Sequence, residues 1–271
     1  MSNKPPKAYN DQAFLHSAPA RHIRILCEYE EPRQRFLHAG VKNTVVFFGS
    51  ARTRSEEDAL AVLEGVKERL SRDANDAHAL IELPAAEAGV RLSRYYNDAR
   101  HLARRFTGWS MERQGTPYFV CSGGGPGIME AANRGAADVP GGKSVGLGIS
   151  LPFEQGVNRW VTPELAFEFH YFFTRKYWFL YLCKGLVIFP GGFGTLDEFF
   201  ETLTLVQTGK MSRRPPIILF GKEYWEEVLN LRAMAKWGTI SPKDLDLFHI
   251  TDSVEDAFDF LTKGLEAAEA R

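Results

Sequence analysis

Apolar residues fall into two kinds of pattern along the chain. Some form short runs, long enough for a buried strand and too short for a helix, at residues 44–49, 118–121, 145–149, 186–189 and 217–220, and residues 167–173 also have strand character. Others recur every three or four positions, as on one face of a helix, within residues 55–66, 85–106, 131–136, 174–184, 195–206, 223–237 and 253–268. Because strands alternate with helices, the pattern predicts an α/β fold with a doubly wound, Rossmann-like parallel sheet and helices on both faces.

The N-terminal part of the chain has a different pattern. Residues 1 to about 12 are polar and contain prolines, which predicts a disordered start, and residues 13–40 are helical in pattern with breaks at Pro19 and Pro32. We therefore expect a helical extension over residues 1–40 and a single Rossmann-like domain over residues 41–271. Within that domain, residues 151–166 predict an irregular excursion, because they contain Pro152, Gly156 and Pro163.

The stretch from Gly185 to Glu201 carries the clearest functional signal. Pro190 ends an apolar run, and Gly191, Gly192 and Gly194 then allow a ligand to approach the main chain closely. A helix follows this glycine loop, so unpaired N–H groups and the positive end of the helix converge on one spot. A strand, a glycine loop and a helix in this order predict a site for a phosphate or another anion.

Glu198 has two interpretations on spacing alone. Thr195 can cap the helix through its hydroxyl, and Glu198 three residues later then completes the Thr-x-x-Glu signature of a capping box. Alternatively, Glu198 is a functional carboxylate beside the glycine loop. The spacing favours neither interpretation.

A second strand, glycine loop and helix occur at residues 118–136, with the loop sequence Ser122-Gly-Gly-Gly-Pro-Gly-Ile-Met-Glu130. Two nucleotide-binding motifs fail here. The dinucleotide motif GxGxxG needs a glycine where Ile128 or Glu130 stands, and a P-loop that ends at Ser144 needs a glycine where Ala137 stands. Both glycine loops leave strands at the same sheet edge, so we expect one to bind a phosphate and the other to line a sugar or base.

The predicted helix at residues 174–184 begins with two basic residues, Arg175 and Lys176, and is otherwise rich in aromatic residues. The two basic side chains either point to solvent or enter the site, and the sequence alone does not decide between these alternatives. The cluster of Tyr177, Trp178, Phe179 and Tyr181 exceeds what one helix face usually buries. We therefore expect at least a homodimer.

Composition excludes several classes of function. The net charge of -1 offers no global field for nucleic acid or for an anionic membrane. Cys27, Cys121 and Cys183 are odd in number and far apart, so they predict no disulfide framework and no metal site, and they fit a reducing, cytoplasmic compartment. The polar start is not a signal peptide, and the apolar run at residues 177–183 is too short to span a bilayer.

The motif Pro190-Gly-Gly-x-Gly-Thr-x-x-Glu198 resembles the signature of the LOG (Lonely Guy) family. Members of that family are phosphoribohydrolases that act on nucleoside 5′-monophosphates, and many have been described as "possible lysine decarboxylase". The similarity runs from about residue 44 to residue 221 and includes residues 48–52, 122–130 and 173–176. The N-terminal extension and residues 151–173 resemble the longer bacterial members of the family.

The resemblance implies a set of site residues, no cofactor, no metal and a homodimer or higher homo-oligomer. It implies that Arg175 and Glu198 are catalytic. The residues that it implies for substrate binding are Ser50, Gly124, Gly125, Gly127, Met129, Lys176, Gly191, Gly192, Gly194 and Thr195.

The function expected from these observations is hydrolysis of the N-glycosidic bond of a nucleoside 5′-monophosphate, such as AMP or a cytokinin riboside 5′-monophosphate. Breaking this bond builds positive charge on the ribose, which a carboxylate can stabilise. The alternative is a protein of the same fold that binds or senses a nucleotide without turnover. Pyridoxal-dependent lysine decarboxylation is rejected, because it needs a cofactor domain with an acidic partner for the pyridine, and the sequence suggests none.

Overall fold

The computed structural model describes residues 5, 7–151, 156–211 and 214–270. The described residues form a seven-stranded sheet with the order β4-β3-β2-β1-β5-β6-β7, and each pair of neighbours is parallel. The strands are β1 (Asn43–Phe48), β2 (Tyr118–Ser122), β3 (Ser144–Ile149), β4 (Ala166–Phe169), β5 (Cys183–Ile188), β6 (Ile217–Phe220) and β7 (His249–Thr251).

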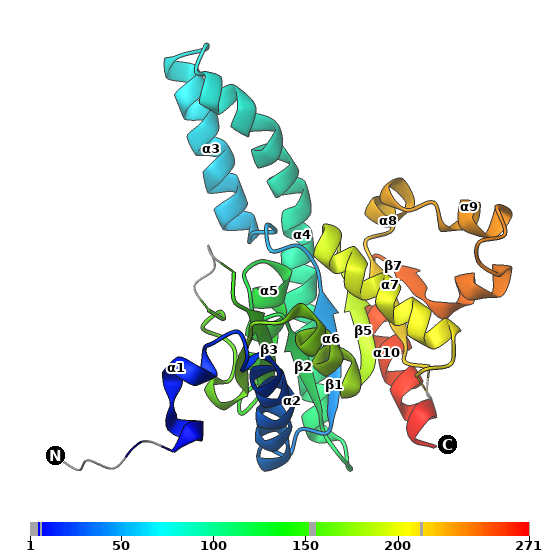
Figure 1. Ribbon diagram of the computed structural model, residues 1–271. Helices are drawn as coiled ribbons and strands as arrows, with labels where there is room; N and C mark the ends of the chain where they lie inside the picture. The colour runs from blue at the N-terminus through cyan, green and yellow to red at the C-terminus, as the bar shows by residue number, and fades with distance from the viewer. Residues whose placement is uncertain (1–4, 6, 152–155, 212–213, 271) are drawn as a thin grey trace.

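Helices cover both faces of this sheet (Figure 1). One face packs against α4 (Ala77–Glu112), α5 (Ile128–Ala137) and α10 (Val254–Glu269). The other face packs against α2 (Arg21–His38), α6 (Phe172–Tyr181), α7 (Phe193–Gln207) and α8 (Lys222–Val228). The predicted doubly wound, Rossmann-like α/β class is therefore confirmed.

Burial on both faces explains why the central strand β1 is a continuous apolar run from Val45 to Phe48. In the central strand β1, Val45 and Phe47 enter the core under α4 and α5, whereas Val46 and Phe48 enter the core under α2, α6 and α7. All four side chains are buried. A polar residue at any of these positions would be placed inside one of the two cores.

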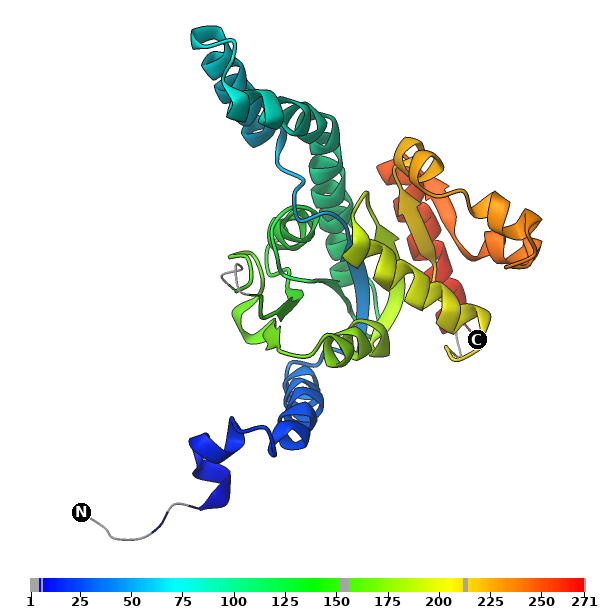
Figure 2. The same ribbon diagram turned by 45° about the horizontal axis from the view of Figure 1, so that its top comes forward.

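A helical hairpin, formed by α3 (Glu56–Arg72) and the outer half of α4, stands away from the sheet in both views (Figures 1 and 2). A small apolar cluster around Val66, Ala79 and Ala86 and an ion pair between Arg69 and Glu82 join its two helices. The predicted start of the second helix at residue 85 is wrong. The Asp76 side chain accepts a hydrogen bond from the N–H of Ala79 and caps α4 there, and Pro84 is accommodated inside the helix.

The N-terminal extension contains the short helix α1 (Gln12–Leu15) and the longer α2, which are separated at Pro19 as predicted. The predicted break at Pro32 is wrong, because α2 continues through it. A proline has no N–H to donate to the carbonyl four residues earlier, here that of Glu28. The indole Nε1–H of Trp178 donates to this carbonyl instead, at 2.9 Å, so the freed acceptor is satisfied.

Of the start predicted to be disordered, residues 1–4 and 6 lie outside the described residues, while Ala8–Asn10 form the 3₁₀ helix η1. Part of the predicted excursion, residues 152–155 with Pro152, is also outside the described residues. Its remainder includes the 3₁₀ helix η2 (Pro163–Leu165), so the interpretation of the whole segment as irregular is only partly right.

Two predicted elements differ from those in the structure. The strand predicted at residues 167–173 is too long, because β4 ends at Phe169 and α6 already begins at Phe172. The helix predicted at residues 223–237 is divided into α8 and α9 (Leu231–Lys236), because the side chain of Asn230 caps a new helix through the N–H of Ala233. The 3₁₀ helix η3 (Pro242–Leu247) then leads into β7.

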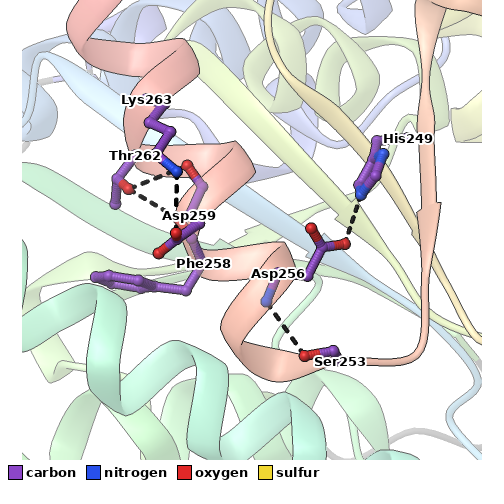
Figure 3. Close-up of polar contacts among 7 residues, drawn as sticks. All are labelled: His249, Ser253, Asp256, Phe258, Asp259, Thr262 and Lys263. Carbon is purple, nitrogen blue, oxygen red and sulfur yellow. Dashed lines mark hydrogen bonds and ion pairs between the residues drawn. The ribbon is translucent and has the colours of Figure 1, made fainter.

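The C-terminal helix α10 is held to the edge strand β7 by polar contacts (Figure 3). The side chain of Ser253 caps α10 by accepting from the N–H of Asp256, as its predicted start implies. The carboxylate of Asp256 lies 2.6 Å from Nε2 of His249 on β7. None of the helices in the described residues combines the length and the apolar character needed to cross a bilayer.

Candidate functional site

The carboxyl ends of β1, β2 and β5 lie at one edge of the sheet, where the strand order reverses. β2, β3 and β4 extend from β1 on one side, whereas β5, β6 and β7 extend on the other. Ligands of open α/β sheets bind outside such a switch point. A cavity of about 740 Å³ opens there, between the loops that follow these three strands and the helices α6, α7 and α8.

Ser50, in the loop after β1, joins the two glycine loops through its main chain. Its N–H donates to the carbonyl of Pro190 at 2.9 Å, and its carbonyl accepts from the N–H of Ile128 at 3.1 Å. Gly127 adopts a φ of 73°, and a Cβ at this position would lie 2.3 Å from the carbonyl oxygen of Ser50. The glycine is therefore required for this close approach, although Gly127 itself does not line the cavity.

A buried polar network fixes the first glycine loop. The Nδ2 group of Asn158 donates to the carbonyls of Gly124 and Gly125, at 2.9 and 3.1 Å. The hydroxyl of Ser122 accepts from the N–H of Gly124 at 3.0 Å and donates to the side-chain oxygen of Asn133 at 2.7 Å. Gly125 lines the cavity, whereas Gly124 supports the turn behind it with a φ of 71°.

In the second glycine loop, the structure corrects the predicted helix start. Helix α7 begins at Phe193 with Gly192 as its N-cap, so Thr195 already lies in the first helical turn and does not cap. No side chain among the described residues caps this end of α7. The first N–H groups of a helix have no partner within the helix, and here they face the cavity lined by Gly191, Gly192 and Thr195. Such an end is a ready anion site.

Glu198 lies in the second turn of α7, so its interpretation as half of a capping box is wrong. The side chain lines the cavity, yet the residue is only 4% exposed. Among the residues that the structure describes, its Oε2 atom has no hydrogen-bond partner. Burial raises the pKa of Glu198 to about 7, against the lowering effect of the nearby positive charges of Lys176 and Arg175.

Arg175 and Lys176 have separate positions, and the interpretation in which both point to solvent is wrong. Arg175 lines the cavity, and its guanidinium lies 5.2 Å from the ring centre of Phe172 and 5.5 Å from that of Phe179. Lys176 does not line the cavity. Its Nζ is 2.9 Å from the carboxylate of Asp197 and 2.7 Å from that of Glu201, so it connects α6 to α7.

The structure thus brings most of the expected site residues together around one cavity and leaves three outside its lining. Those that line it are Ser50, Gly125, Met129, Arg175, Gly191, Gly192, Gly194, Thr195 and Glu198. Those that do not are Gly124, Gly127 and Lys176. In the described part of the chain, no group of three or more His, Cys, Asp or Glu side chains is placed to hold a metal ion.

Other lining residues carried no sequence signal. The hydroxyl of Tyr224, on α8, donates to the carbonyl of Gly191 at 2.7 Å and fixes the second glycine loop from the far side. Leu92, Phe172, Phe193 and Val228 form apolar parts of the lining, and Phe193 is 93% exposed. These residues come from four helices that are distant in the sequence, so only the fold assembles them.

An uncapped helix N-terminus and a buried carboxylate thus lie together at the switch point of a doubly wound α/β fold, an arrangement suited to holding an anion and to acid–base chemistry. Residues 129–261 match the family described as "Possible lysine decarboxylase". This match confirms the resemblance to the LOG family that was drawn from the glycine motif at residues 190–198, which lies within the matched range. No curated protein matches the chain at a significant level.

The close packing of Gly191 generates a testable difference in stability between substitutions at two glycines of the same motif, Gly191 and Gly194. A Cβ at residue 191 would lie 2.2 Å from Oγ1 and 2.7 Å from Cβ of Thr195, so rotation of Thr195 cannot relieve the clash. We expect Gly191→Ala to lower the free energy of unfolding by about 1–3 kcal/mol.

The matched control is Gly194→Ala, since a Cβ at residue 194 has no neighbouring atom within 4 Å. This change lies within α7 and should leave stability unchanged or raise it by up to about 1 kcal/mol. Urea unfolding of the two variants measures the difference. Equal stabilities would show that the loop does not pack on Thr195 as described.

Proposed function

We propose that the protein is a phosphoribohydrolase that cleaves the N-glycosidic bond of a nucleoside 5′-monophosphate. The observation that supports this most directly is the carboxyl group of Glu198. It is buried, lacks a partner for one oxygen among the described residues, and lines the same cavity as Arg175 and the uncapped end of α7. A merely structural carboxylate would be paired or exposed.

The 5′-phosphate binds at the N-terminus of α7 in this proposal. The N–H groups of its first turn supply donors, and the helix dipole favours the negative charge. Gly191 and Gly192 let the phosphate come close to the main chain. The cavity volume of about 740 Å³ is within the range of small-molecule sites, and the apolar side chains of Phe172, Phe193 and Leu92 offer a surface for the flat base.

The reaction adds water to C1′ of the ribose and breaks the bond between C1′ and the base nitrogen. The electron pair of that bond leaves with the base, which takes up a proton, and the other product is ribose 5-phosphate. Positive charge builds on the ribose in the transition state, and the carboxylate of Glu198 stabilises it and accepts the proton of the attacking water. Arg175 anchors the phosphate or holds the carboxylate in place.

The site does not support the lysine decarboxylation named in the family description. A pyridoxal enzyme of that kind forms a Schiff base through a lysine in its active site. No lysine is among the described residues that line the cavity. The nearest candidate in sequence, Lys176, is held by the carboxylates of Asp197 and Glu201.

Glu198→Gln and Arg175→Ala test the proposed chemistry with AMP as the substrate and free adenine as the product. We expect each change to lower turnover by about a hundredfold or more while the melting temperature stays close to that of the unchanged protein. Glu226→Gln, which alters an exposed residue of α8, is the control and should keep full activity.

A folded Glu198→Gln variant with a near-normal rate would remove Glu198 from the mechanism. Adenosine is tested beside AMP, and equal turnover of the two would contradict phosphate binding at α7. Tight binding of AMP with no release of adenine would favour the alternative, a nucleotide-binding or sensing protein without turnover.

The raised pKa of Glu198 generates opposite pH trends in activity and stability. Since the carboxylate is the active form, we expect kcat/KM to rise with pH up to about 7 and then to level off. A folded-state pKa above the ordinary value means that stability is fully present below the unfolded pKa of about 4.5 and falls as pH rises to about 7.

Glu198→Gln should remove the fall in stability, which urea unfolding between about pH 4 and pH 8 measures. A pH–rate profile of the unchanged protein with its acid limb near pH 4.5 would show that Glu198 titrates normally.

We propose that the protein forms a homodimer through the exposed face of α6. Trp178 and Phe179 are buried in the core, but Tyr177 and Tyr181 are 40% and 56% exposed and stack with ring centres 5.0 Å apart. Phe173 is also exposed on this helix. Aromatic residues gathered on a surface are typical of interface centres, and the same surface on a second copy offers a matching partner.

Light scattering should therefore give a mass of twice 30.5 kDa or a multiple of it. Tyr181→Glu should reduce this mass to that of one chain, because it places a charge in an apolar contact. Trp237→Glu changes an aromatic residue that is 84% exposed on another part of the chain, and should leave the mass unchanged. A single-chain mass for the unchanged protein would refute the dimer.

A further inference from the structure

Glu28, in the N-terminal extension, holds the helix that carries Arg175. Its carboxylate accepts hydrogen bonds from the N–H of His170 at 2.8 Å, from the N–H of Tyr171 at 3.3 Å and from the hydroxyl of Thr174. Tyr171 is the N-cap of α6, and its own side chain caps nothing. The carboxylate of Glu28 on α2 thus replaces the side-chain cap that Tyr171 does not supply. It also places a negative charge at the N-terminus of α6, which is the positive end of the helix dipole.

The main chain of Glu28 holds the same helix at a second point. Pro32 has no N–H for the carbonyl of Glu28, and the indole of Trp178 donates to it at 2.9 Å. Trp178 is buried and lies one turn beyond Thr174 on α6. Because one residue is bonded both to the start of α6 and to its middle, α6 can neither slide nor rotate against α2 without breaking hydrogen bonds.

Arg175 directly follows Thr174, so this attachment sets the place from which its side chain enters the cavity. A guanidinium near the positive end of a helix is also electrostatically unfavourable, and the carboxylate of Glu28 offsets this effect. The first turn of α6 contains no acidic residue of its own. The N-terminal extension therefore supplies the negative charge that the first turn of α6 lacks.

We infer that Glu28 is a positioning residue of the site, which acts through α6 to place Arg175 opposite Glu198. The inference rests on the proposed function for its activity readouts, but not for its binding and exchange readouts. It assigns the N-terminal extension a part in the site, although α1 and α2 contribute no residue to the cavity lining among the described residues.

The test uses the full chain with Glu28→Ala and Glu28→Gln. Glu28→Gln keeps an oxygen that accepts one bond, loses the charge and is the variant less disturbing to folding. Glu30→Ala is the matched control, because it removes a carboxylate from the same helix that pairs with Arg33 at the surface. The measurements are kcat and KM for AMP, the pH–rate profile, AMP affinity by calorimetry, and hydrogen exchange of residues 170–175.

We expect Glu28→Ala to lower kcat/KM by about tenfold to a hundredfold, Glu28→Gln to lower it less, and Glu30→Ala to leave it unchanged. Amide exchange at the start of α6 should quicken. The positive charges of Lys176 and Arg175 lower the pKa of Glu198, while the negative charges of Glu201 and Asp197 raise it. A displaced Arg175 lowers this pKa less, so the acid limb of the pH–rate profile should move to higher pH. A purely structural role would reduce the melting temperature without moving this limb.

Folded Glu28 variants with unchanged kcat, KM and acid limb would overturn the inference and leave the proposed function intact. If the unchanged protein releases no base, the proposed function fails instead. AMP affinity then decides the inference: weaker binding in both Glu28 variants than in Glu30→Ala supports it, and equal binding overturns it.

Discussion

A carboxyl group that is buried without a full set of hydrogen bonds is costly, and the site is built around one such group, that of Glu198. Burial alone would favour its protonated form, and only nearby positive charge opposes this effect. The two cations come from α6, so the charge state of Glu198 depends on how α6 lies against α7. Every contact that fixes α6 is therefore also a contact that sets the acid–base properties of the cavity.

Patterns that depend on local sequence predicted the fold and the glycine loops. Continuous apolar runs indicated strands buried on both faces, and the glycines after Ile188 and Ser122 marked where a ligand can approach the main chain. One error arises where a distant residue overrides a local rule. Pro32 does not end α2, because Trp178 satisfies the carbonyl that the proline leaves free. The error at α7 is local: the helix starts at Phe193 with Gly192 as its N-cap, so Thr195 is already helical and its side chain lies against Gly191.

The residues that hold the glycine loops could not be predicted, because each acts through the backbone of a remote segment. Asn158 and Tyr224 lie in an excursion and in a short helix, and each donates to glycine carbonyls of a different loop. A single asparagine or tyrosine has no spacing that reveals such a role. Yet glycine is conformationally permissive, and under the proposed function a preorganised anion site needs the loop carbonyls bonded to other groups of the protein. These two side chains do that.

Arg175 and Lys176 are neighbours on α6 but have different roles. Successive helical side chains point in directions about 100° apart, so Arg175 enters the cavity while Lys176 faces α7. There it pairs with Asp197 and Glu201, whose negative charges raise the pKa of Glu198. Without Lys176 these carboxylates would push Glu198 further toward its protonated form. Under the proposed function, the phosphate needs no lysine, because the end of α7 supplies its donors. The lysine instead neutralises the protein's own acids and so keeps Glu198 able to lose its proton near neutral pH.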